Sequence, residues 1–246
     1  MGSDAEAVKN EEPGGAGLWE DFVDIFYAPS SVFARRSDGK FGMPLLLLVL
    51  VGVVLAFLTK NATQPIMDAE FARQSAAAMR RNPSLTAEQM AGSRGFFEMM
   101  APLLFALFLT ISIFGTGLVL WVVGKLFDAK ESVAAAIMIA TYAEVPRLVQ
   151  ILTNAAQGLV MSQEKLNSIN AVGFSLARFM DPDNTSQVVL IALAARVDLF
   201  TIWITVLLAI GLHVVGKIPK QQAAIVAAIT WAVGALPAVF RALQAG

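Results

Sequence analysis

Residues 133–161 read VAAAIMIATYAEVPRLVQILTNAAQGLVM. A transmembrane helix needs roughly 20 apolar residues to cross about 30 Å of hydrocarbon, and this run is long enough. Glu144, Pro146 and Arg147 interrupt it near its middle. Because a charge at the bilayer centre costs about 2.5–3.5 kcal/mol on insertion scales, these two charges need partners there. The stretch therefore predicts a transmembrane helix with a polar centre that faces protein.

The charges within this run predict an ion pair. Glu144 and Arg147 are three residues apart and share one face of a helix. Pro146 cannot donate to the Tyr142 carbonyl, so it either kinks the helix or leaves that carbonyl free for Arg147. Asp198, in a later apolar segment, is a second carboxylate for Arg147. We name Tyr142, Glu144, Pro146, Arg147 and Asp198 as a candidate intramembrane polar cluster.

Two alternatives place these charges at the membrane surface. A shorter, tilted span would put Glu144 and Arg147 near the headgroups. Likewise, Arg196 and Asp198 would mark only the interfacial entry of their own span.

Composition indicates a membrane protein and limits its chemistry. The 246 residues are 57% hydrophobic and 15% charged, against about 25% charged in a typical soluble domain. The chain has no cysteine, one histidine and a net charge of −1. These counts give no thiolate chemistry, no set of metal ligands and no bulk attraction to nucleic acid. With no phosphate loop or nucleophile motif either, we expect no catalytic residue, no metal and no cofactor.

Five apolar runs predict an all-α, polytopic membrane domain over residues 43–246. They are residues 43–59, 99–124, 133–161, 188–216 and 223–239. The polar segment 61–98 is too long for a simple connection, and its composition predicts a helical hairpin outside the bilayer. Thr86 and Gln89 fit a capping box at the start of its second helix.

The N-terminal residues predict a peripheral segment. We expect residues 1–17 to form a disordered tail without a cleavable signal peptide, and residues 18–42 to form interfacial helices. In the first helix, apolar residues share one face and Asp21 lies on the opposite, acidic face. Packing on the protein's own loops is the alternative. We name five interfacial residues, of which the basic ones would meet anionic headgroups: Trp19, Phe22, Arg35, Arg36 and Lys40.

A repeated motif predicts internal duplication. Residues 122–125 read VVGK, and the same motif recurs 92 residues later at 214–217. Pro237 likewise follows Pro146 by 91 residues. Spans two–three and four–five would then be one helical hairpin used twice in parallel orientation. Lysines beside both VVGK motifs, with Arg35 and Arg36, favour a cytoplasmic N-terminus.

Three groups of residues carry a family resemblance. They are Phe22, Ile25, Pro29 and Phe33 before the first span; Tyr142, Ala143 and Pro146 in the third; and Asp198, Phe200, Ile202 and Trp203 in the fourth. In this order the chain resembles the Yip-domain family, five-span membrane proteins whose eukaryotic members are named for binding Ypt/Rab GTPases. The long loop after the first span resembles the bacterial branch, which implies a multi-pass protein of the bacterial cytoplasmic (inner) membrane. No segment resembles a GTPase-binding motif, so the resemblance implies no GTPase partner.

Two functions follow as hypotheses. The first is a non-enzymatic scaffold or adaptor for membrane organisation or trafficking-like processes, whose partners are lipids and other membrane proteins or a second copy. Small residues on the last span, Ala223, Ala227, Gly234 and Ala238, would suit close helix packing. The alternative is a small homo-oligomeric transporter or channel with a polar path through Glu144, Arg147 and Asp198.

Overall fold

The computed structural model describes residues 17–245, so the expected tail lies outside the described residues except for Gly17. This part of the chain is helical, which confirms the all-α fold class. Its α-helices are α1 (Leu18–Asp24), α2 (Pro29–Arg35), α3 (Gly42–Leu58), α4 (Lys60–Arg81), α5 (Ala87–Lys125), α6 (Val133–Ala143), α7 (Pro146–Val160), α8 (Val188–Arg196), α9 (Leu199–Gly216) and α10 (Lys220–Ala245). Three short 3-10 helices lie between α7 and α8: η1 (Gln163–Lys165), η2 (Leu176–Phe179) and η3 (Thr185–Gln187).

The apolar helices make this a multi-pass membrane protein. Four segments in the described residues are long and apolar enough to cross a bilayer: α5, α6 with α7, α9 and α10. The first expected span, α3, has 17 residues and is about 26 Å long. It passes the same test together with α4, from which it is bent by 79°. The described residues thus contain four candidate spans, or five if the bent pair counts as one.

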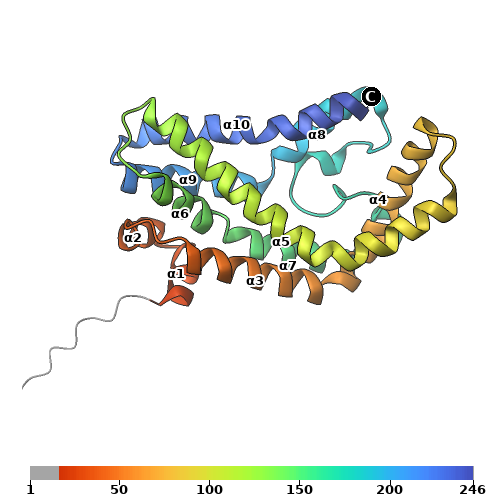
Figure 1. The fold of residues 1–246 in the computed structure, drawn as a ribbon, viewed down its shortest axis with the longest axis horizontal. Helices are drawn as coiled ribbons and strands as arrows, with labels where there is room; N and C mark the ends of the chain where they lie inside the picture. Colours follow the sequence, from red (N-terminus) through yellow and green to blue (C-terminus); the bar gives the residue numbers. More distant parts are fainter. Residues whose placement is uncertain (1–16, 246) are drawn as a thin grey trace, which may run out of the picture.

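Helix α6 is the centre of the bundle. All nine residues from Ala135 to Ala143 are buried, and α6 packs on α5, α9 and α3. Two glycines allow the close approach. A Cβ on Gly117 of α5 would lie 2.8 Å from the Ile137 Cα, and one on Gly211 of α9 would lie 2.5 Å from Ile139 Cγ2. Figure 1 shows α6 enclosed by the longer helices.

Two expected spans are broken where polar residues occur. Residues 133–161 form α6 and α7, with Pro146 as the first residue of α7. The prediction of one helix over residues 188–216 is wrong, because α8 ends at Arg196 and α9 begins at Leu199. The Asp198 side chain accepts hydrogen bonds from the Phe200 and Thr201 amides, and such a cap starts a new helix.

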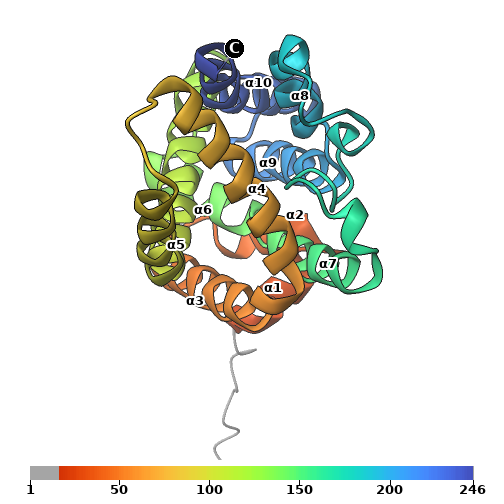
Figure 2. The ribbon, with the colours of Figure 1, turned by 90° about the vertical axis from the view of Figure 1, so that its right-hand side faces the viewer.

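The polar segment after α3 forms an arm at one end of the molecule, made of α4 and the first part of α5 (Figure 1). Thr86 and Gln89 form the expected capping box. The second helix of the expected hairpin does not end before the next span, because α5 continues for 39 residues. Figure 2 shows α4 between α5 and α7. It approaches α7 so closely that a Cβ on Gly158 would lie 2.3 Å from the Ala62 carbonyl oxygen.

Ion pairs hold this arm together and tie it to the loop between α7 and α8. Arg94 pairs with Asp68 of α4 and with Glu98 on its own helix. Arg73 lies 2.8 Å from Asp183 and donates to the Asn167 carbonyl. Arg73 therefore anchors the arm to the loop between α7 and α8.

Candidate polar site within the bundle

The break between α6 and α7 forms a polar turn inside the bundle. The Val145 amide donates to the Tyr142 carbonyl at 3.2 Å, and the Arg147 amide donates to the Glu144 carbonyl at 2.9 Å. The prediction that the Tyr142 carbonyl is free for Arg147 is therefore wrong, because a tighter turn satisfies it. Glu144 lies 11 residues into this segment, about 17 Å along it, a length close to half of a 30 Å hydrocarbon layer.

Glu144 and Arg147 form the predicted pair. Arg147 Nε lies 2.5 Å from Glu144 Oε2, and Nη2 lies 3.3 Å from Oε1. Glu144 is 5% exposed. This two-point contact neutralises both charges on one face of one segment.

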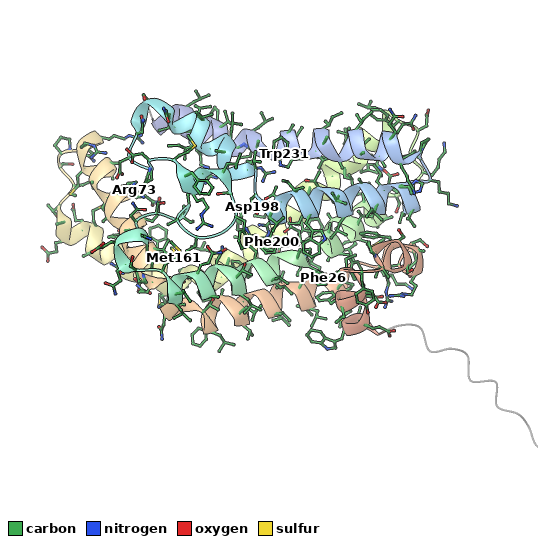
Figure 3. The ribbon with its side chains drawn as sticks, turned by 180° about the vertical axis from the view of Figure 1, so that it is seen from behind. Phe26, Arg73, Met161, Asp198, Phe200 and Trp231 are labelled. Carbon is green, nitrogen blue, oxygen red and sulfur yellow. The ribbon has the colours of Figure 1, made fainter. Side chains whose placement is uncertain are left out.

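Asp198 joins this pair only through Gln150. Arg147 Nη1 donates to Gln150 Oε1 at 3.0 Å, and Gln150 Nε2 donates to Asp198 Oδ1 at 3.3 Å. Asp198 is buried, caps α9 and also accepts from the Phe174 amide at 3.3 Å. Figure 3 shows Asp198 between Trp231 and Phe200. Its first role is therefore to start α9.

A small polar cavity of about 90 Å³ lies beside the pair. Glu144, Arg147 and Arg196 line it together with five hydroxyl groups, those of Ser112, Thr116, Thr201, Thr205 and Thr230. Arg196 Nη2 donates to the Trp231 carbonyl at 3.2 Å, and Trp231 Nε1 donates to the Arg196 carbonyl at 3.4 Å. Arg196 Nε is buried and has no partner among the described residues. The cavity is thus polar, and the Arg196 Nε–H group is available to donate a hydrogen bond.

Tyr142 belongs to a different site, which we call the Asp21 clamp. The Tyr142 hydroxyl donates to Asp21 Oδ2 at 3.2 Å. Arg35 Nη2 and Arg36 Nε approach the same carboxylate at 2.7 and 2.6 Å. Asp21 is fully buried, although it lies on the acidic face of α1, because the protein itself covers that face. The clamp defined by Asp21, Arg35, Arg36 and Tyr142 fastens α1 and α2 to α6.

The proposed interfacial residues divide between this clamp and the surface. Phe22 is 4% exposed and packs edge-on against Tyr142, whereas Trp19 is 62% exposed. Arg35 and Arg36 have intramolecular carboxylate partners. Lys40 is exposed and pairs with Asp38 at 3.0 Å.

Asp24 is the second carboxylate at Arg35. Hydrogen bonds from Tyr27 and then Arg35 lower the pKa of Asp24.

Residues that carry the family resemblance meet in the interior. The Phe22 and Tyr142 ring centroids are 6.0 Å apart, and Phe26 next to the pattern lies 5.3 Å from Trp203. Ile25 and Phe33 are fully buried. The pattern therefore records how α1 and α2 pack on α6 and α9.

Sequence reasoning missed three functional partners: Asp21 as an acceptor, Gln150 as a bridge and Arg196 as a cavity residue. Two consecutive arginines at 35 and 36 were a signal that a nearby carboxylate would be enclosed. Gln150 lies three residues after Arg147 on one helical face, which was the signal for the bridge.

One comparison with known proteins identifies the family of this chain. A family model described as the Yip1 domain matches residues 23–240, which is nearly the whole chain. No curated protein and no solved structure matches it. Because the match runs from α1 to α10, the chain is a multi-pass membrane protein that belongs to the Yip1 domain family.

Proposed function

We propose that this protein is a non-enzymatic scaffold or adaptor in a bacterial inner membrane, with its N-terminus in the cytoplasm. One observation carries the proposal: the charges that a transport path would need are satisfied within the protein. Glu144 and Arg147 bind each other, and Asp198 caps α9. Charged groups that are paired within the protein stabilise its fold and are not free to bind a transported solute.

The size of the polar cavity supports the same function. A polar cavity of about 90 Å³ has room for a small number of water molecules. A water cluster can satisfy the lining hydroxyl groups and Arg196 Nε, whereas a metabolite would not fit.

The surface offers room for lipids and for partner proteins. Exposed apolar side chains on α3 and α5 would contact lipid, among them Leu50, Phe57, Leu107 and Ile111. Of the four small residues expected to suit close helix packing, Ala223 and Ala227 are buried where α10 packs on α9, whereas Gly234 is exposed and Ala238 is half-buried. The arm is the better candidate for a partner protein, because Phe96 and Phe97 of α5 are both more than half exposed there.

Crosslinking in native membranes tests the scaffold. A photoreactive amino acid at Phe97 should give a discrete crosslinked product with another membrane protein or a second copy. The same probe at Ile111, which faces lipid, is the control and should give none. Equal products from both positions, or none from either, would contradict a specific partner at the arm.

A homo-oligomeric transporter is the second candidate, and the unpartnered Arg196 Nε favours it. In this alternative the donor would hold a small anion in the polar cavity. Proteoliposomes separate the two functions. Halide flux that is lost in Arg196→Gln but kept in Arg241→Gln, an exposed arginine of α10, would favour transport. No flux from the unmodified protein would favour the scaffold.

A further inference from the structure

Glu131, in the loop between α5 and α6, is a buried carboxyl group. It is 3% exposed, and neither Oε1 nor Oε2 has a hydrogen-bond partner among the described residues. Leaving an ionised carboxylate in such a place is costly unless it is paired. The function proposed above makes no use of this residue.

The two VVGK motifs build the space that holds this carboxyl group. A Cβ on Gly124 would lie 2.7 Å from Glu131 Oε1, and a Cβ on Gly216 would lie 2.9 Å from Oε2. Any larger residue at either glycine would displace the side chain. Gly124 and Gly216 are the third residues of the repeated motifs, so one carboxyl group lies between both copies.

The electrostatic surroundings favour the neutral acid. Gly124 lies in the last turn of α5 and Gly216 ends α9, so the partial negative charges of two helix C-termini meet near the carboxyl group. Lys125 lies nearby, but its Nζ donates to the Ala129 and Glu131 carbonyl oxygens, at 2.6 and 2.7 Å. Burial raises the pKa of Glu131, and its own nearby backbone amide and then the Lys125 charge oppose this only in part.

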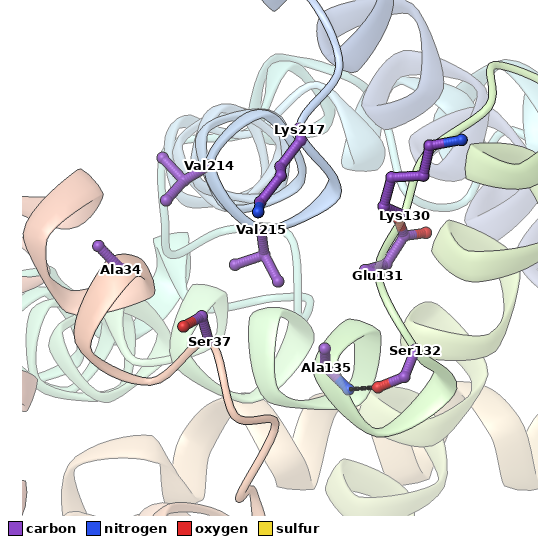
Figure 4. Close-up of a pocket in the computed structure, with 9 residues that line it drawn as sticks. All are labelled: Ala34, Ser37, Lys130, Glu131, Ser132, Ala135, Val214, Val215 and Lys217. Atoms are coloured by element: carbon purple, nitrogen blue, oxygen red, sulfur yellow. Dashed lines mark hydrogen bonds between the residues drawn. The ribbon is translucent and has the colours of Figure 1, made fainter.

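A larger cavity lies beside Glu131. It has a volume of about 590 Å³ and is bounded by the α2–α3 loop at Ser37, by the start of α6 and by the end of α9. Figure 4 shows the Lys217 side chain reaching over Val215 on one side of this cavity, with Glu131 on another. The Lys217 ammonium has no ion-pair partner in the part of the chain that the structure describes.

Lys217 holds an unusual backbone conformation. Its φ of 55° is left-handed, a region that glycine or asparagine usually fills at the end of a helix. A lysine there keeps a cation at the mouth of the cavity despite the strain.

We propose that Glu131 is a proton-binding site that controls contact between the two hairpins. With a proton bound, the carboxyl group stays between Gly124 and Gly216. When the proton is lost, the Glu131 side chain turns into the larger cavity and its carboxylate pairs with Lys217. The loop then separates from the end of α9, and the bond from the Lys130 amide to the Gly216 carbonyl, now 2.8 Å long, breaks.

The sign of the pH dependence follows from this arrangement. The closed state favours the neutral acid, so it dominates at low pH and is lost as pH rises through the raised pKa of Glu131. The equilibrium constant for closure falls about tenfold for each pH unit between the pKa of Glu131 in the open state and its raised pKa in the closed state, and it is constant above the raised pKa. The charged groups around Glu131 are Lys125 of α5, Lys130 of its own loop and Lys217 of α9. His213 of α9 is held by the Ile218 carbonyl at 2.7 Å.

Amide hydrogen exchange of the full chain in nanodiscs tests the proposal. Rates for Lys130 and Ala129, corrected for intrinsic exchange at each pH, should rise between pH 5 and 9 in the unmodified protein. In Glu131→Gln, which mimics the neutral acid, both rates should stay low and constant. Asp128→Asn is the matched control in the same loop and should keep the rise. Lys217→Gln should move the midpoint to higher pH, because it removes the cation that receives the carboxylate.

Two results would overturn the proposal. One is corrected exchange at Lys130 that does not change with pH in the unmodified protein. The other is a rise in Glu131→Gln that equals the rise in Asp128→Asn. Neither result bears on whether the arm binds a partner, so the scaffold function is tested separately.

Discussion

The Tyr142 hydroxyl donates a 3.2 Å hydrogen bond to Asp21 Oδ2 and so joins α6, the central helix, to α1 near the start of the described chain. The two residues are 121 positions apart in the sequence. Arg35 and Arg36 approach the same carboxylate, so a negative charge that would be costly to bury has three donors. The N-terminal helices are therefore part of the bundle, not an independent surface segment.

Asp21→Ala should loosen both N-terminal helices. Removal of the carboxylate leaves the buried Tyr142 hydroxyl group without its acceptor and takes one carboxylate from each arginine, although Arg35 keeps Asp24. Removing one partner of a buried charge pair typically costs about 3–5 kcal/mol. We expect a lower melting temperature in detergent and faster amide exchange over residues 18–36. Glu20→Gln, on the exposed side of α1, is the control and should change neither, because its side-chain oxygen can still accept from the Gly17 amide. Slow exchange over residues 18–36 in Asp21→Ala would show that the aromatic contacts suffice.

Glu144 and Arg147 should behave as one energetic unit. Glu144→Ala alone and Arg147→Ala alone each leave an uncompensated charge and should cost about 3 kcal/mol or more. The double replacement by alanine should recover much of that loss, as measured by thermal unfolding in detergent. Additive losses would mean that the two charges are not paired in the protein.

Gln150 should transmit any coupling between Arg147 and Asp198. We expect a coupling free energy above about 0.5 kcal/mol in the Arg147 and Asp198 double-mutant cycle, measured by the same unfolding assay. The coupling should vanish in a Gln150→Ala background, because Gln150 alone bonds to both side chains. Coupling that persists without Gln150 would point to a direct contact that the structure does not have.

Alanine substitutions at two glycines of α5 distinguish the effect of helix packing on stability from the effect of helix propensity. Gly117→Ala places a methyl group 2.8 Å from the Ile137 Cα and should destabilise the protein by about 1–3 kcal/mol through overpacking. Gly115→Ala, two residues earlier, meets nothing within 4 Å and should be neutral or stabilise by up to about 1 kcal/mol. Thermal unfolding of both variants gives the comparison. Equal effects would show that α6 does not approach α5 so closely.

Membrane orientation can be tested because the chain has no cysteine. Ser84→Cys at the tip of the arm and Lys220→Cys at the start of α10 both place a thiol at an exposed position. A membrane-impermeant maleimide should label the Ser84→Cys variant in intact cells. It should label the Lys220→Cys variant only after the cells are lysed. Labelling of both variants from the same side would contradict a cytoplasmic N-terminus combined with an external arm.

Sequence alone determined the features that depend on local chemistry. Long apolar runs require helices in a bilayer, because each backbone polar group must be satisfied within its own segment. A spacing of three residues predicted the Glu144–Arg147 ion pair. The capping box of Thr86 and Gln89 predicted where α5 begins. The order of the motifs indicated the family that the match over residues 23–240 confirms. The internal repeat stays a prediction, since Pro146 begins α7 whereas the expected counterpart Pro237 lies inside α10.

Only the tertiary structure decided which polar groups are buried and what satisfies them. Asp21 lies on the acidic face of a short helix, and nothing local indicates that two arginines and Tyr142 enclose it. Asp198 caps α9, because a side chain that can bond to its own backbone competes with continuation of the helix. Glu131 lies between two glycines 92 positions apart along the chain, Gly124 and Gly216. Such contacts depend on how helices distant in sequence pack, and a pattern of apolar residues does not encode that packing locally.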